Sequence, residues 1–181
     1  MSCEVKNTIL NKIYFDDKTE YTPDLLVVLL DKSLYEMAFR DILAIREKKV
    51  ASMSCFVLLS CFIDYLSGYY SGSKKTTKRY FLEFCERYLP RYDANVLYKD
   101  IRCKLVHQYT EPRSLIFSDS SKREHLGKYQ DRLIMDLDTF IEDIESAWLE
   151  YRSDIMKDEQ IYKKALKRYL ENGTLNKLGT V

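Results

Sequence analysis

Residues 98–109 carry side chains that could perform phosphate chemistry. Arg102, His107 and Tyr109 follow one another at the spacing Arg-x4-His-x-Tyr, in a segment whose apolar residues recur with a helical period. The guanidinium of arginine is always charged and its planar shape matches phosphate oxygens, whereas histidine can exchange a proton near neutral pH. An arginine and a histidine in one site are therefore sufficient for phosphodiester chemistry without a metal ion.

The helix that carries these residues is predicted to begin after the N-cap Asp93 and to end near Tyr109, before Pro112. In an ideal α-helix, Arg102 and Tyr109 lie on nearly the same face, whereas Arg102 and His107 point roughly 140° apart. The arginine and histidine of one helix are thus not expected to meet. We expect a two-fold dimer instead, in which Arg102 of one chain approaches His107 of the other.

Such a composite site would support the cleavage of RNA. The 2′-hydroxyl attacks the adjacent phosphorus, His107 assists proton transfer, and Arg102 stabilises the charge on the phosphoryl oxygens. The last helical turn favours the protonated form of His107, which suits a general acid. DNA lacks the attacking hydroxyl and should resist cleavage. The alternative is that the spacing arises by chance and that the histidine only caps carbonyl groups at a helix end.

The segment from Arg102 to Tyr109 resembles the Arg-x4–6-His motif of HEPN domains. With its tyrosine it resembles the Arg-x4-His-x-Tyr form of HEPN toxins that are paired with nucleotidyltransferase antitoxins. The resemblance implies a helical bundle, dimerisation across the motif helices, and metal-independent ribonuclease activity with Arg102 and His107 as catalytic residues. It also implies that Tyr109 is the regulatory position to which the antitoxin attaches a nucleotide. Cys103 departs from the family pattern, in which a polar residue usually follows the arginine.

Charge is unevenly distributed along the chain, although its net charge is only +1, which excludes a generally cationic coat for nucleic acids. Residues 74–104 contain nine Lys or Arg and four acidic residues, whereas residues 131–159 contain ten acidic residues and three basic ones. The basic segment could attract polyanions beside the motif, or it could be an ordinary solvated face. The predicted nucleic-acid-binding residues are Lys74, Lys75, Lys78, Lys99 and Lys104.

The remaining sequence predicts the elements that position the motif. Thr22 and Pro23 indicate a helix start, with helical residues to Lys48 and a possible break at 31–33. Further helices are expected over about 50–70, 77–89, 93–109, 138–156 and 159–170, with a frayed terminus from Asn172. Segments 114–117 and 132–135 are expected to pair as a two-stranded β ribbon. The prediction is an all-α, HEPN-like helical bundle in a single domain over 1–181, with this ribbon inserted at about 112–136.

Two features of the most apolar helix concern its environment. Its longest apolar run, 50–63, is interrupted by serines and is shorter than the ~20 residues of a membrane span, so a core helix is expected. Asp64 would need a partner there if it is buried, and a structural pair with an arginine is favoured over a catalytic role.

The cellular setting follows from the termini and the cysteines. Residues 1–6 are too polar for a signal peptide, and a cytoplasmic protein without a membrane partner is expected. Five cysteines without metal-ligand spacing are expected to be reduced and mostly buried, and neither a metal nor a cofactor is expected. The sequence thus favours a homodimer that cleaves or binds RNA. The alternative is a non-catalytic interaction module in which the basic and acidic segments meet at a protein interface.

Overall fold

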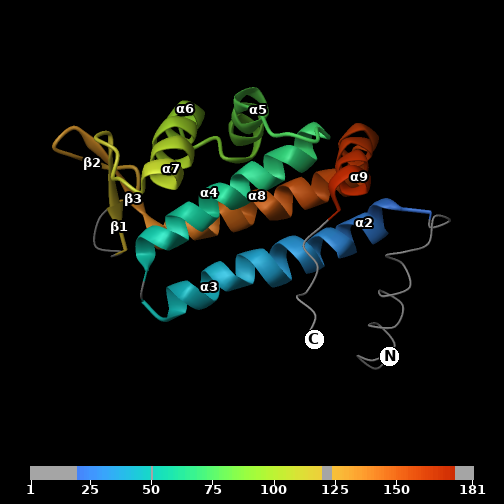
Figure 1. The fold of residues 1–181 in the computed structure, drawn as a ribbon, viewed down its shortest axis with the longest axis horizontal. Helices are drawn as coiled ribbons and strands as arrows, with labels where there is room; N and C mark the ends of the chain where they lie inside the picture. The colour runs from blue at the N-terminus through green and yellow to red at the C-terminus, as the bar shows by residue number, and fades with distance from the viewer. Residues whose placement is uncertain (1–19, 50, 120–123, 174–181) are drawn as a thin grey trace.

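Helix α4, Ser52–Ser71, lies at the centre of the molecule in the computed structural model, which describes residues 20–49, 51–119 and 124–173 (Figure 1). The predictions for residues 1–6, for Cys3 and for the terminus beyond residue 173 lie outside these ranges. The described residues are mostly helical, as predicted, with one small sheet.

The setting of α4 is that of a core helix. It contacts helices on several sides, including α5, α8 and α9, whose bounds are given below. By length and composition α4 could cross a membrane, but 56% of its most apolar window is buried inside the structure. This burial agrees with the predicted core helix.

The N-terminal helical rod begins where the sequence predicted. The Thr22 hydroxyl accepts a hydrogen bond from the Leu25 N–H, and Pro23 occupies the first helical position. The rod consists of α2 (Pro23–Leu30), the π-helix η1 (Asp31–Phe39) and α3 (Arg40–Glu47). The predicted break at 31–33 is therefore the start of a wider helical winding, and the rod continues through it.

The helices on the other side of α4 include the motif segment (Figure 1). Helix α5 (Lys78–Tyr88) is capped by Thr77, and Asp93 caps α6 (Ala94–Val96). The motif continues as the π-helix η2 (Leu97–Leu105) and the short α7 (Val106–Gln108), which ends where Tyr109 adopts the left-handed conformation. The predicted bounds of the motif helix are close to these, but its winding differs from an α-helix over most of its length.

Two C-terminal helices complete the bundle. Helix α8 (Leu137–Lys157) is capped by Asp136 and runs alongside α4, and α9 (Glu159–Asn172) is capped by Asp158 and crosses the far end of α4 (Figure 1). The core between these helices is rich in aromatic rings. Phe56 of α4 stacks on Phe140 of α8 with ring centroids 5.9 Å apart.

The segment between α7 and α8 forms a sheet with one strand more than predicted. Strands β1 (Leu115–Ser118) and β3 (Arg132–Asp136) pair in parallel, and β2 (Lys128–Tyr129) pairs antiparallel with β3, which gives the order β1-β3-β2. The predicted two-stranded ribbon was wrong in strand number, because β2 is a two-residue, exposed strand without an apolar pattern. Phe117 of β1 packs on Phe56 of α4 with ring centroids 4.4 Å apart, and this contact attaches the sheet to α4.

The four described cysteines are free thiols. Cys55 and Cys85 are buried, whereas Cys61 is exposed and Cys103 is half-buried. The prediction of mostly buried thiols therefore holds for only two of these four. Cys61 on α4 lines the site described below, and Cys103 directly follows the Arg102 of that site in η2.

Candidate functional site

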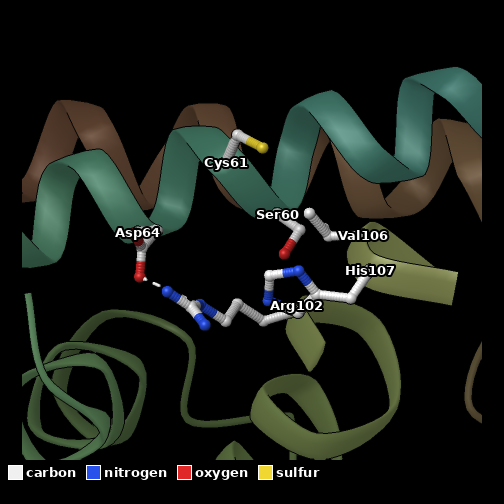
Figure 2. A pocket seen from close by; sticks show the side chains of 6 residues that line it. All are labelled: Ser60, Cys61, Asp64, Arg102, Val106 and His107. Atoms are coloured by element: carbon white, nitrogen blue, oxygen red, sulfur yellow. Dashed lines mark hydrogen bonds and ion pairs between the residues drawn. The ribbon is translucent and has the colours of Figure 1, made fainter. Parts of the chain in front are cut away.

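Arg102 and His107 line the same pocket of one chain, contrary to the expectation for an ideal α-helix. Hydrogen bonds in a π-helix span five residues instead of four, so residues five apart come closer to alignment than in an α-helix. Because Arg102 lies in η2, the wide winding turns His107 toward the same side. The pocket lies between α4 and the η2–α7 segment (Figure 2), and its lining residues are Ser60, Cys61, Asp64, Arg102, Val106 and His107.

The pocket is small. Its volume is about 120 Å³, which corresponds to the space of about four water molecules at ~30 Å³ each. Pockets that enclose a whole small-molecule ligand usually measure about 300–1,000 Å³. The pocket of one chain can therefore hold a group the size of a phosphate with some water, but it cannot enclose a nucleotide.

Asp64 is the acidic neighbour of the motif arginine. Its Oδ1 lies 3.4 Å from Nε of Arg102, and the two side chains are 30% and 28% exposed. Burial acts to lower the pKa of Arg102, but Asp64, together with Cys103 and Tyr98, raises that pKa above its ordinary value. The predicted pairing of Asp64 with an arginine is confirmed, and the partner is the motif arginine itself.

A tyrosine ring connects Arg102 to a second cation. The Arg102 guanidinium lies 5.5 Å from the centroid of the Tyr98 ring, and the Lys78 ammonium lies 5.7 Å from the same centroid. Both distances are within the range of cation–π attraction. The motif arginine is therefore held by Asp64 at its Nε and by an aromatic ring, while Lys78 brings a further positive charge from the start of α5.

Ser60 supplies an unpaired hydroxyl at the pocket. The residue is 1% exposed, and within the described residues its Oγ has no hydrogen-bond partner. Figure 2 shows this oxygen directed toward the His107 side of the pocket. A buried hydroxyl without a partner costs free energy, so a polar ligand that reached it would be stabilised. Asp64 is paired with Arg102, so a Ser-His-Asp relay is not what this arrangement forms.

Ser60 and Cys61 were missed by the sequence prediction. They lie in an apolar helix where serine and cysteine are common core residues, and only the packing of α4 on η2 brings them to the site. The single available signal was their position three and four residues before Asp64.

The regulatory candidate Tyr109 lies away from the pocket-lining residues. Its side chain is 61% exposed, and its hydroxyl lies 3.4 Å from Oγ of Ser54. Tyr109 and Arg102 both contact α4, through Ser54 and Asp64, but Tyr109 follows the end of α7 and is not among the residues that line the pocket.

The predicted lysines differ in their surroundings. Lys104 forms a 2.7 Å ion pair with the buried Asp100, which also accepts a hydrogen bond from Ser114. In the part of the chain that the structure describes, the other predicted lysines take part in no ion pair; these are Lys74, Lys75, Lys78 and Lys99.

Some of the basic segment is neutralised inside the chain. Arg87 pairs with Asp154 at 2.7 Å and Arg91 pairs with Asp143 at 3.0 Å, so two arginines face the acidic helix α8. The basic and acidic segments therefore meet partly within one molecule. Among the described residues, the predicted lysines that form no ion pair are Lys78 at the start of α5, Lys74 and Lys75 before it, and Lys99 on η2.

The other histidine of the chain, His125, belongs to a separate network that the sequence analysis did not identify. The backbone N–H of Asp136 donates to its Nδ1 at 3.0 Å, and its Nε2 lies 2.8 Å from the Tyr92 hydroxyl, which in turn donates to Asp143 at 2.6 Å. These partners place the ring hydrogen of neutral His125 on Nε2. Burial lowers the pKa of His125.

Within the described residues, no group of three or more His, Cys, Asp or Glu side chains is arranged to hold a metal ion. Comparisons of the chain with protein-family models, with curated proteins and with solved structures find no match in any of the three.

Proposed function

We propose that this protein is a cytoplasmic, HEPN-like, metal-independent endoribonuclease that acts as a homodimer. The observation that carries the proposal is the shared pocket, in which Arg102, His107 and the unpaired hydroxyl of Ser60 surround a space the size of a phosphate group. Phosphate is the ligand whose oxygens can use a guanidinium, an imidazole and a hydroxyl at once.

The proposed reaction uses RNA's own 2′-hydroxyl as the nucleophile. The phosphate between two nucleotides binds against Arg102, which stabilises the charge that develops on the phosphoryl oxygens. As the 2′-oxygen bonds to phosphorus, its proton passes to water and the bond from phosphorus to the 5′-oxygen breaks. His107 donates a proton to the departing 5′-oxygen, and the product carries a 2′,3′-cyclic phosphate. Asp64 contacts only Nε of Arg102, which leaves the terminal nitrogens of the guanidinium for the phosphate.

A second copy of the chain would supply the walls that one pocket lacks. The 120 Å³ pocket is too small for a nucleotide. Through Cys61 it borders an apolar pocket of about 420 Å³ between α4 and the η1–α3 part of the N-terminal rod. Apolar side chains that line this second pocket are Ala38, Ile42, Ile45, Leu58, Phe62 and Tyr65. An apolar surface beside an incomplete polar site is typical of a protein interface.

The test is a ribonuclease assay in EDTA with the purified wild-type protein and the variants Arg102→Ala and His107→Ala. The wild type should cleave RNA to a product that carries a cyclic phosphate, whereas Arg102→Ala and His107→Ala should not cleave. Lys128→Ala, which changes an exposed lysine on β2, is the matched control and should cleave normally. Equal cleavage by all four proteins, or none by the wild type, would remove the enzyme proposal.

The second candidate function is a non-catalytic interaction module. It is favoured by the contacts of Arg102 with Asp64 and with the ring of Tyr98, which are also contacts that a purely structural arginine makes. This function predicts salt-sensitive self-association or partner binding without RNA cleavage. Loss of the dimer in His107→Ala, with no effect on RNA, would support it.

Regulation through Tyr109 is a further part of the proposal. Its exposed hydroxyl could accept a nucleotide from a nucleotidyltransferase-type antitoxin. Mass spectrometry after co-expression with such an enzyme should find one added nucleotide on wild-type protein and none on Tyr109→Phe. Unmodified Tyr109 in the wild type would contradict this regulation.

A further inference from the structure

We infer that the ligand site extends from Arg102 across Tyr98 to Lys78, and that it takes two neighbouring phosphates of one single strand of RNA. This inference rests on the proposed function and adds the substrate class and its path. It assigns Lys78 a binding role, and it assigns Tyr98 the role of a positioning residue between two cations.

The charge of the pocket alone is insufficient for tight phosphate binding. Asp64 lies 3.4 Å from Arg102, so a phosphate entering the pocket meets a cation that is already partly neutralised. Affinity for nucleic acid comes mainly from cations that contact phosphates. A second, unneutralised cation near the pocket is therefore needed.

Lys78 is placed to be that cation. Its ammonium and the Arg102 guanidinium lie 5.7 and 5.5 Å from the same ring centroid, so the two cations are at most about 11 Å apart. A single strand is flexible, and proteins bind it in positively charged grooves that follow its phosphate backbone. Neighbouring phosphates of one strand can therefore contact both cations at once.

The ring of Tyr98 is fixed in this place by its own packing. It lies edge-on to the buried Phe81 of α5, with ring centroids 5.4 Å apart. Because the ring cannot easily move, its attraction for the two cations limits their mobility. The loop before α5, which leads to Lys78, is held as well, since the buried Arg168 donates hydrogen bonds to the carbonyls of Ser73 and Lys74.

The shape of the site favours a single strand over a duplex. A phosphate that reaches Arg102 must enter the pocket between α4 and the η2–α7 segment (Figure 2). A flexible strand can turn one phosphate into such a pocket while the next contacts Lys78. A double helix presents its phosphates on a stiff, convex surface, and proteins recognise it by its overall shape.

The experiment measures binding of a fluorescent 2′-O-methyl uridine hexamer, which lacks the attacking hydroxyl and stays intact during titration. Lys78→Ala should weaken the Kd several-fold and should reduce the slope of log K against log salt by about 0.7, the value for one phosphate contact of a single strand. Lys128→Ala should change neither quantity. Competition by 2′-O-methyl UpU, which has one phosphate and also lacks the attacking hydroxyl, should be equal in wild type and Lys78→Ala.

Tyr98 is tested by a pair of variants. Tyr98→Leu should weaken hexamer binding because the ring that holds the two cations is lost, whereas Tyr98→Phe, which keeps the ring, should restore wild-type binding. A Tyr98→Phe protein as weak as Tyr98→Leu would overturn the positioning role.

The outcomes separate this inference from the proposed function. If Arg102→Ala abolishes hexamer binding while Lys78→Ala behaves as wild type, the extension is wrong and the proposed function stands. Equal or tighter binding of a duplex of the same length would overturn the single-strand assignment. Failure of the wild type to bind the hexamer at all would overturn both.

Discussion

The two histidines of the chain lie in opposite environments. His107 is exposed at the pocket between α4 and α7, beside Arg102. His125 is half-buried between the sheet and the bundle, and both of its ring nitrogens have protein partners. The same side chain is thus available for a ligand in one region and committed to the fold in the other.

This difference teaches that the partners of a histidine, more than its place in a motif, indicate what it can do. An imidazole with free nitrogens at a solvent-reachable pocket can exchange protons with a substrate. An imidazole whose Nδ1 accepts from a backbone N–H cannot become protonated without losing that bond. Substituting His107 and substituting His125 should therefore have different consequences.

The largest expected effect is on catalysis. His107→Ala should reduce RNA cleavage by about 100-fold or more, which is the usual contribution of a general acid or base. Its melting temperature should stay within error of the wild type, because the residue is exposed. His125→Ala, assayed at a temperature where it remains folded, should retain most of the activity. The reverse pattern would show that the roles of the two histidines have been exchanged.

The second effect is on stability. His125→Ala removes a hydrogen bond to the Tyr92 hydroxyl and leaves the backbone N–H of Asp136 without its acceptor. We expect a loss of about 1–3 kcal/mol in the free energy of unfolding, which is the cost of an unsatisfied buried donor. Urea denaturation would measure it. His107→Ala is the control and should change the free energy of unfolding by less than about 0.5 kcal/mol.

The third effect is a pH dependence carried by His125. Burial lowers its pKa in the folded protein below the ordinary value of 6.5, although the carboxylates of Asp143 and Asp136 oppose this and Arg91 adds to it. Below pH 6.5 the unfolded chain therefore binds a proton more readily than the folded one, and the free energy of unfolding falls as the pH decreases toward the folded pKa. Above pH 6.5 this contribution is fully present.

Urea titrations between pH 7.5 and 5 test the pH dependence. The wild type and His107→Ala should lose stability over this range, and His125→Ala should lose less. An identical slope in all three proteins would assign the pH dependence to other groups.

The smallest effect concerns Asp64, the carboxylate that contacts Arg102 in the pocket of His107. Asp64→Asn removes the carboxylate that partly neutralises Arg102, so the affinity for the RNA hexamer should rise a few-fold. Stability should change by less than about 1 kcal/mol, because a partly exposed ion pair contributes little. Fluorescence polarisation would measure the affinity. A higher Kd for Asp64→Asn than for the wild type would mean that Asp64 aids binding by orienting the Arg102 guanidinium, and that this outweighs its repulsion of the phosphate.

Most helices of the fold could be predicted from caps and periodicity. Thr22, Thr77 and Asp93 begin helices as their residue types indicate, because their side-chain oxygens satisfy free backbone N–H groups. The pairing of Asp64 with an arginine also followed from the cost of a buried carboxylate. These features depend on local chemistry, which the sequence records directly.

The winding of the motif helix could not be predicted in the same way. The hydrogen bonds of a π-helix span one residue more than those of an α-helix. The apolar residues of η2 recur in a pattern that does not distinguish the two kinds of helix. Long-range partners were equally hidden. His125 is 33 residues from Tyr92, and no local signal links the two.

The wide turn of η2 also bears on how related sites are recognised in other sequences. Residues five apart in a π-helix lie on nearly the same side of the helix, as residues three or four apart do in an α-helix. An arginine and a histidine at this separation therefore line one pocket only when the helix between them is wound as a π-helix. Deleting one residue between Arg102 and His107 would keep both side chains but would reduce their separation from five positions to four, the spacing that an α-helix aligns. A search for paired side chains that assumes ideal α-helical geometry would reject this protein, although its two residues share a pocket.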